Sequence, residues 1–164
     1  MARIVRNVTP DSVDFRDRPY HPSVALIPGP ELRPPLLADL PMLNQQSTDA
    51  CTGFALATCV HALLLRRDRA LAKPVSPFML YSMARRYDEF PGSARDTGSS
   101  LRGTMKGWYK HGACAEGLWQ SLAMPKAKKD ATDDWWQDAV NRPLGAYYRI
   151  NTQSIADMHA ALNE

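Results

Sequence analysis

Cysteine is scarce in this sequence, with three among 164 residues. A number that is both small and odd does not make a disulfide framework, so we expect a reducing compartment such as the cytoplasm. No window approaches the ~18 uncharged apolar residues that a membrane-spanning helix needs. The first residues carry Arg3 and Arg6 and lack the apolar region of a signal peptide, which also indicates a cytoplasmic protein.

A strong excess of one charge is lacking too, because 20 basic residues face 17 acidic ones and the net charge is +3. This balance is too mild to indicate nucleic acid or a membrane surface as a partner. No two histidine or cysteine residues stand at the spacing of metal ligands, so we expect neither a metal ion nor a cofactor. The hydrophobic fraction of 45% is sufficient for one packed core, which excludes a wholly disordered chain.

Proline, by contrast, is abundant, and eight of the 13 prolines lie within the first 41 residues. Such a density forbids long helices and favours extended chain and turns. We expect residues 1–43 to form an extended arm that packs on a folded core formed by residues 44–164. A disordered tail is the alternative, although Val24, Leu26 and Ile27 supply apolar anchors for a packed arm.

Two long helices are predicted in the first half of the core. Residues 50–69 are apolar on nearly all sides, which predicts a buried helix. Thr48 or Asp49 is its natural N-cap. Ser76 followed by Pro77 marks the start of a second helix, which ends about ten residues later.

The later part of the chain shows shorter elements. Gly112 is placed to end a helix, and Gly103 and Gly107, four residues apart, indicate close packing of that helix. Tyr147 and Tyr148 favour a strand. The fold class is therefore α+β and mainly helical, with a loop over 89–100, a helix over 100–111, a short helix capped by Thr132, a strand over 146–150 and a helix over 153–163.

The most informative segment is LNQQSTDACTGFA, residues 43–55, in which an amide-rich turn leads into the first predicted helix. Cys51 stands at the start of that helix, where unpaired N–H groups and the dipole favour an anion and hence the nucleophilic thiolate. The Cys51 N–H points to where an oxyanion would form, and the Gln45 amide could be a second donor. A cysteine at this place can also be merely a small core residue. Cys59 and Cys114 are expected to be buried and inert.

The spacing Asn44-Gln45-x5-Cys51, followed by Gly53-Phe54-Ala55, resembles the active-site segment of the papain-like cysteine peptidases, in particular their bacterial branch. The similarity extends over nearly the whole chain, through PDSVDFRDRPYHPS at 10–23, VSPFMLYSMARR at 75–86, DTGSSLRGTMKGWYKHGACAEGLW at 96–119 and YYRINTQSIADMHAAL at 147–162. Only the segment 43–55 is specific. The resemblance implies that residues 44–164 form the helical lobe of a two-lobed peptidase.

The resemblance also implies roles for particular residues. The family's nucleophile falls on Cys51 and its oxyanion-binding glutamine on Gln45. The glycine turn that pairs with the substrate backbone falls on Gly98 and Ser99. The two positions that follow the turn would lie near the wall of the main specificity pocket, and these are Ser100 and Leu101.

Some residues depart from the family pattern. Gln46 stands where the family has a glycine, and Ser99 replaces the second glycine of the substrate turn. Thr52 replaces the usual aromatic residue after the nucleophile, a change that the bacterial branch shares. Asp49 places a negative charge close to the thiol, which opposes thiolate formation unless the carboxylate is engaged in capping.

The family also needs a histidine base and an asparagine or aspartate that orients it, both on a second, β-rich lobe. The sequence has four histidines, and none of them fits that motif. They are His21, His61, His111 and His159. The chain ends at Glu164, about where the second lobe would begin. We therefore expect the nucleophile-bearing half of the fold, with the second lobe absent.

The resulting hypothesis is a papain-like cysteine peptidase that hydrolyses peptide bonds but is incomplete, and so inactive, in this chain alone. Its partners would be a peptide or protein substrate, and either the missing second lobe or a second copy of the chain over the apolar face left open. The alternative is a non-catalytic peptide-binding or interaction module, either a pseudo-peptidase or a half-fold remnant.

Overall fold

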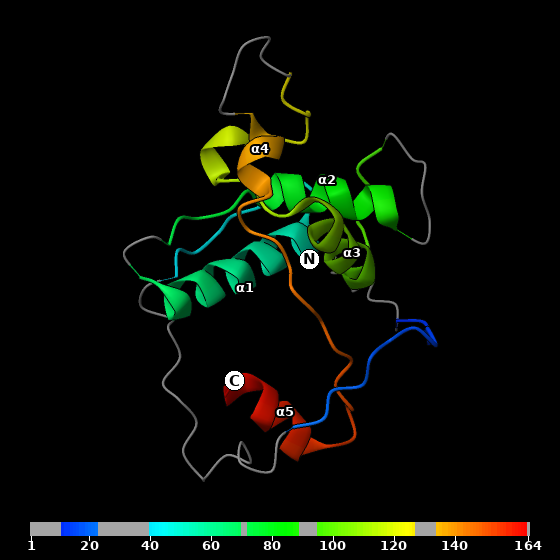
Figure 1. The fold of residues 1–164 in the computed structure, drawn as a ribbon. Coiled ribbons are helices and arrows are strands. Elements are labelled where there is room, and N and C mark those ends of the chain that lie inside the picture. The colour runs from blue at the N-terminus through cyan, green and yellow to red at the C-terminus, as the bar shows by residue number, and fades with distance from the viewer. Residues whose placement is uncertain (1–10, 23–39, 70–71, 89–94, 127–133, 164) are drawn as a thin grey trace, which may run out of the picture.

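The computed structural model describes residues 11–22, 40–69, 72–88, 95–126 and 134–163. Figure 1 shows their arrangement, with α1 (Cys51–Arg67), α2 (Pro77–Tyr87), α3 (Leu101–His111), α4 (Trp135–Ala139), α5 (Ile155–Asn163) and a 3-10 turn η3 (Glu116–Leu118). These residues are mainly helical and contain no strand, only two isolated bridges. No helix among them is long and apolar enough to cross a membrane.

Helix α2 packs closely against both α1 and α3, and glycines make the close approach possible. A Cβ added to Gly53 of α1 would lie 2.4 Å from the Pro77 carbonyl oxygen and 2.6 Å from the Tyr81 Cβ. A Cβ added to Gly107 of α3 would lie 2.9 Å from the Met83 Cβ, and one added to Gly103 would lie 2.9 Å from a carbonyl of α2. The predicted close packing at Gly103 and Gly107 is confirmed.

The core lies on both sides of α2. On one side, Leu56 and Val60 of α1 meet Leu80 of α2 and Trp108 of α3. On the other side, a second cluster joins α2 to the turn η3 and to α4, with Met79, Met83, Cys114, Trp119 and Ala139. These two clusters make α2 the central helix of the bundle.

The predicted ends of α2 and α3 are confirmed. The Ser76 side chain accepts a hydrogen bond from the Met79 N–H at 3.0 Å, and Pro77 is the first helical residue. Helix α3 ends at Gly112, which has φ 75°. Both helices therefore begin and end where the sequence predicts.

The predicted caps of α1 and α4 were wrong. Ala50 precedes α1 without a side-chain cap, because the Thr48 hydroxyl instead donates to the Gln45 carbonyl within the preceding turn. Helix α4 begins after Asp134, whose carboxylate caps it reciprocally with Gln137. The cap predicted at Thr132 lies outside the described residues.

Helix α1 is not buried on all sides, in contrast to the prediction. Cys51, Ala55, Cys59 and Leu63 are exposed and recur at every fourth residue, so they form one stripe along the helix. Residues four apart share a face of a helix. The neighbouring segments therefore leave one apolar face of α1 uncovered. This α1 stripe is open in the described structure.

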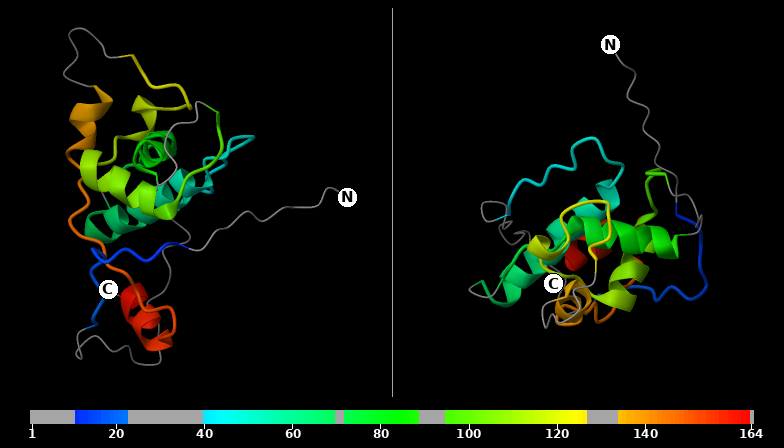
Figure 2. Two further views of the ribbon diagram at one scale, coloured as in Figure 1. Left: turned by 90° about the vertical axis from the view of Figure 1, so that its right-hand side faces the viewer. Right: turned by 90° about the horizontal axis from the view of Figure 1, so that it is seen from above.

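The strand predicted over 146–150 is also absent, because its backbone pairs with another segment at one residue only. Arg149 forms an isolated parallel bridge with Pro19. Its N–H donates to the Arg18 carbonyl at 2.8 Å, and its carbonyl accepts from the Tyr20 N–H at 2.9 Å. The segment 11–22 thus runs beside the chain that leads to α5, which lies apart from α1–α3 in Figures 1 and 2.

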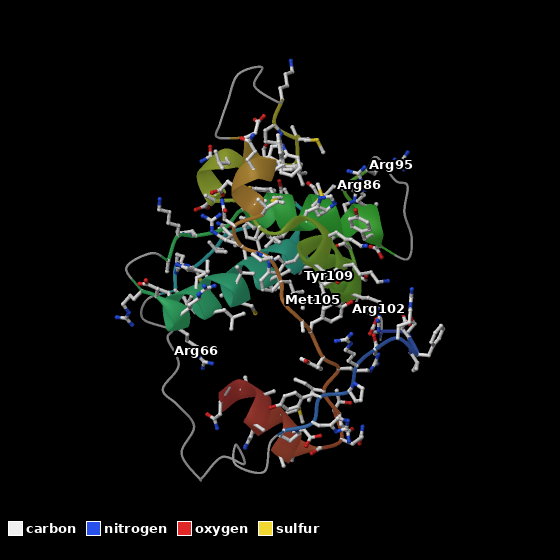
Figure 3. The ribbon with its side chains drawn as sticks, in the orientation of Figure 1. Arg66, Arg86, Arg95, Arg102, Met105 and Tyr109 are labelled. Atoms are coloured by element: carbon white, nitrogen blue, oxygen red, sulfur yellow. The ribbon has the colours of Figure 1, made fainter. Side chains whose placement is uncertain are left out.

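Segment 11–22 is tied to α3 by charge. The buried Arg102 guanidinium donates to the carboxylates of Asp11 and Asp17 at 2.5–3.0 Å, and Figure 3 shows Arg102 on the side of α3 that faces this segment. Arg149 adds a second bond to Asp17 at 2.7 Å. The anchors expected at Val24, Leu26 and Ile27 lie outside the described residues, so the arm's extent to residue 43 stays a prediction.

Replacing Gly53 with alanine is expected to lower the free energy of unfolding by about 1–3 kcal/mol or more, because the methyl group forces α1 away from α2. Chemical denaturation monitored by circular dichroism measures this change. Gly117→Ala is the matched control, since a Cβ there meets nothing within 4 Å. Equal effects of the two substitutions would contradict the close packing described for Gly53.

Asp17→Asn is expected to lower the free energy of unfolding by about 1–2 kcal/mol at neutral pH, because two arginines lose a charged acceptor. The hydrogen bond from Arg102 lowers the pKa of Asp17 from 3.8 to about 2. The carboxylate therefore stabilises the fold above pH ~4, and this contribution is lost as the pH falls toward 2.

The difference between Asp17→Asn and the unmodified chain should accordingly shrink between pH 4 and pH 2, which denaturant titrations at several pH values can follow. Arg16→Gln serves as the control, because the Arg16 side chain is 70% exposed and such surface pairs contribute little. A constant difference across this pH range would refute the linkage.

Candidate active site

Cys51 is the first residue of α1 and is exposed. The preceding Ala50 is fully buried in a cluster with Phe54 and Tyr81, so the chain enters the helix from the core. The thiol then lies on the open surface at the point where the helix presents unpaired N–H groups. This position is the one that the sequence predicts for a nucleophile.

The loop before α1 is held by its own side chains. The Gln45 Nε2 donates to the Thr48 carbonyl at 2.7 Å, and the Thr48 N–H and hydroxyl both donate to the Gln45 carbonyl, at 3.2 and 2.7 Å. A carboxamide nitrogen carries two hydrogens, so one remains for another acceptor. The role of Gln45 as an oxyanion donor stays a prediction.

Gln46 has a left-handed backbone conformation, with φ 55°. Its N–H donates to the Asn44 Oδ1 at 2.8 Å, which closes a small turn. A residue with a Cβ has a cost of roughly 1–2 kcal/mol in this region, whereas glycine adopts it freely. This cost explains why the papain-like sequence pattern has a glycine at this position. Gln46 adopts the same conformation at that cost.

The structure brings the Gly98–Ser99 turn beside the start of α1. The hydroxyls of Thr52 and Ser99 are 2.5 Å apart, although 47 residues separate them in the chain. Gly98 has φ 83°, and a Cβ added to it would lie 3.9 Å from the Asp49 carbonyl oxygen. Within the described residues, no hydrogen bond uses the backbone N–H or C=O of Ser99, so both groups are available to an extended ligand.

Two residues that the sequence analysis missed connect this turn to the loop before Cys51. Asp96 accepts a hydrogen bond from the Asp49 N–H at 2.8 Å and a short one from the Tyr81 hydroxyl. The Tyr81 hydroxyl in turn accepts from the Gly98 N–H at 3.0 Å. No local sequence signal identifies these partners, since they come from three separate segments.

The two positions after the turn have different environments. Ser100 is the N-cap of α3: its hydroxyl accepts from the Gly103 N–H at 2.9 Å, and its own N–H donates to Asp88 at 3.0 Å. Its side chain is therefore engaged in the fold. Leu101 is 67% exposed and free to contact a ligand.

The other two cysteines differ from each other. Cys59 was expected to be buried, but it is exposed, because it lies two turns after Cys51 on the same open stripe. Partial desolvation nevertheless raises the pKa of its thiol. Cys114 is buried as predicted, and burial, aided by the Asp138 carboxylate, raises the pKa of its thiol to about 12.

The four histidines all belong to the described residues, and none is hydrogen-bonded to Cys51 there. His61 is buried in α1, about 15 Å along the helix axis from Cys51 by the rise of 1.5 Å per residue. His111 meets the Tyr87 hydroxyl at 2.8 Å, and desolvation lowers its pKa. His21 and His159 are exposed.

A hollow of about 470 Å³ lies beside the nucleophile loop. Met42, Leu43, Phe54, Phe78, Glu116 and Gln120 line it, and neither Cys51 nor Gly98 does. No three histidine, cysteine or acidic residues in the described ranges are grouped so as to hold a metal ion.

This helical arrangement is similar to part of the fold of a solved cysteine protease. The solved structure of xylellain, a cysteine protease from Xylella fastidiosa, matches the chain with a TM-score of 0.67 and 24% sequence identity. The match covers 94% of this chain and 61% of xylellain, so the chain spans less than two thirds of that protein. Neither a protein-family model nor a curated relative matches the sequence.

Alkylation of the folded chain by iodoacetamide is expected to be fastest at Cys51, slower at Cys59 and undetectable at Cys114. Both exposed thiols are accessible, but the pKa of Cys59 is raised by partial desolvation, which lowers the share of its reactive thiolate. Site-resolved mass spectrometry measures the three rates. Modification of Cys114 only after denaturation is the internal control, and faster reaction of Cys59 than of Cys51 would contradict the assignment.

Proposed function

We propose that this chain is the nucleophile-bearing helical lobe of a papain-like cysteine peptidase. The observation that carries the proposal is the juxtaposition of the exposed Cys51, at the start of α1, with the Gly98–Ser99 turn through the Thr52–Ser99 contact. One segment offers a nucleophile and the other offers free backbone groups to an extended peptide. The cysteine-protease fold supports the same function.

In the proposed reaction, the Cys51 Sγ bonds to the carbonyl carbon of the scissile peptide, and its proton passes to a base outside this chain. The oxyanion accepts hydrogen bonds from the Cys51 N–H and the free Gln45 N–H. The C–N bond then breaks, the base returns the proton to the leaving amine, and a thioester remains. Water hydrolyses the thioester through a second oxyanion and releases Cys51.

The exposed α1 stripe favours the presence of a partner that covers it. Cys51, Ala55, Cys59 and Leu63 are exposed along one face of α1, and Leu63 is 53% exposed. A second lobe that carries the base would cover this face and complete the site. A second copy of the chain is the alternative occupant, and either would remove apolar surface from water.

A non-catalytic peptide-binding module is the second candidate function. It is favoured by one observation, namely that none of the four histidines is hydrogen-bonded to Cys51 in the described part of the chain. Such a module would use the Gly98–Ser99 turn to bind an extended peptide without cleaving it. The two functions differ in turnover and in their dependence on Cys51.

The 164-residue chain alone is expected to show no peptide hydrolysis, whereas a longer product that includes a second lobe should hydrolyse a fluorogenic peptide. In that longer product, Cys51→Ala should abolish activity, and Gln45→Ala should lower the rate by about 10²–10³-fold through loss of an oxyanion donor. Cys59→Ala is the matched control and should retain activity. Turnover by the short chain, or full activity of Cys51→Ala, would overturn the proposed mechanism.

A further inference from the structure

Tyr81 and Asp96 connect three segments of the chain at the candidate site. The Asp49 N–H donates to one oxygen of Asp96, the Tyr81 hydroxyl donates to the other, and the Gly98 N–H donates to the Tyr81 oxygen. This series of three hydrogen bonds runs from the loop before the nucleophile to the turn that would receive a peptide. Hydrogen bonds through the side chains of Tyr81 and Asp96 thus join the loop before Cys51 to the turn.

The series has a rigid support. The Tyr81 side chain is fully buried, its Cβ lies against Gly53, and its ring packs with Ala50 and Phe54 beneath the start of α1. The hydroxyl therefore has a fixed position relative to Cys51. Burial and the bond to Asp96 raise the pKa of Tyr81 far above its usual range, so the hydroxyl keeps the proton that it donates.

The donors and acceptors of Tyr81 and Asp96 match the groups to which they are hydrogen-bonded. The Tyr81 hydroxyl donates to Asp96 and accepts from Gly98 with the same oxygen, and the Asp96 carboxylate offers one oxygen to Asp49 and the other to Tyr81. Because the Gly98 N–H is used on the inner side of the turn, the N–H and C=O of Ser99 are left for an outer partner. The series thus determines which edge of the turn faces a ligand.

We propose that Tyr81 and Asp96 are positioning residues that hold the Gly98–Ser99 turn in the orientation that binds a peptide backbone next to Cys51. This inference rests on the proposed function and deepens it, since it assigns peptide-binding geometry to two residues that touch no substrate. Loss of either side chain frees the turn while Cys51 stays at the start of α1.

The test compares two reagents at Cys51 in the folded chain. Iodoacetamide needs only an accessible thiol, whereas a peptidyl chloromethyl ketone also needs backbone pairing with the turn. Tyr81→Phe removes the hydrogen bonds to Asp96 and from Gly98. It is expected to lower the rate with the peptidyl reagent about tenfold or more and to change the iodoacetamide rate less than twofold. Asp96→Asn, nearer the surface, should have the same selective effect and remains informative if Tyr81→Phe does not fold.

Tyr148→Phe is the control, because Tyr148 is 52% exposed and lies outside the series. Hydrogen exchange of the Gly98 amide adds a readout independent of reactivity and should accelerate in both variants. If the unmodified chain prefers the peptidyl reagent and both variants keep that preference, the positioning role is wrong while the proposed function stands. If the unmodified chain shows no preference, peptide binding by the turn fails, and both proposals fall together.

Discussion

The contact of α1 with α2 at Gly53 is the constraint on which the rest of the structure depends. Because no side chain separates the two helices there, the Tyr81 Cβ lies directly against the backbone of α1. This proximity buries Ala50 and directs the Tyr81 hydroxyl toward Asp96 and Gly98. The candidate site is therefore built on a steric requirement two residues after the nucleophile, and its hydrogen bonds follow from that requirement.

A second, electrostatic constraint acts in the first turn of α3. Arg102 is buried on account of the carboxylates around it, and a guanidinium in that position is favourable only while its partners remain charged. Asp11 and Asp17 lie on the segment before the core, whereas Arg149 approaches them from the chain after it. The side chain of Arg102 thus joins the first described segment to α3, and the side chain of Arg149 joins it to the chain before α5. Backbone pairing between the two ends of the described chain is limited to one bridge.

The sequence predicts those features that depend on neighbouring residues. Ser76 with Pro77, and Gly112, define helix ends because their effects act within one turn, and Cys51 at the start of α1 follows from the same reasoning. The cap of α1 was missed because Thr48 and Gln45 satisfy each other inside the turn. Cys59 was assigned to the core because composition shows how apolar a helix is, but not which face its neighbours cover.

Long-range partners escaped prediction for a different reason. Tyr81 and Asp96 look like an ordinary helix residue and an ordinary loop residue, and only the packing at Gly53 brings them together. The strand over 146–150 was predicted from β-propensity, which reflects fit to a neighbouring strand, and the described structure supplies a neighbour at Arg149 only. The proposed catalytic roles of Cys51 and Gln45 come from the sequence resemblance.

The two exposed thiols of the α1 stripe also determine how the molecule behaves toward oxidants. Cys51 and Cys59 are eight residues apart, or about 12 Å along the helix axis. A disulfide requires Cα atoms within about 7 Å, so the two thiols cannot bridge within one intact helix. Each molecule is therefore divalent toward other molecules, and any disulfide that these two thiols form joins separate chains.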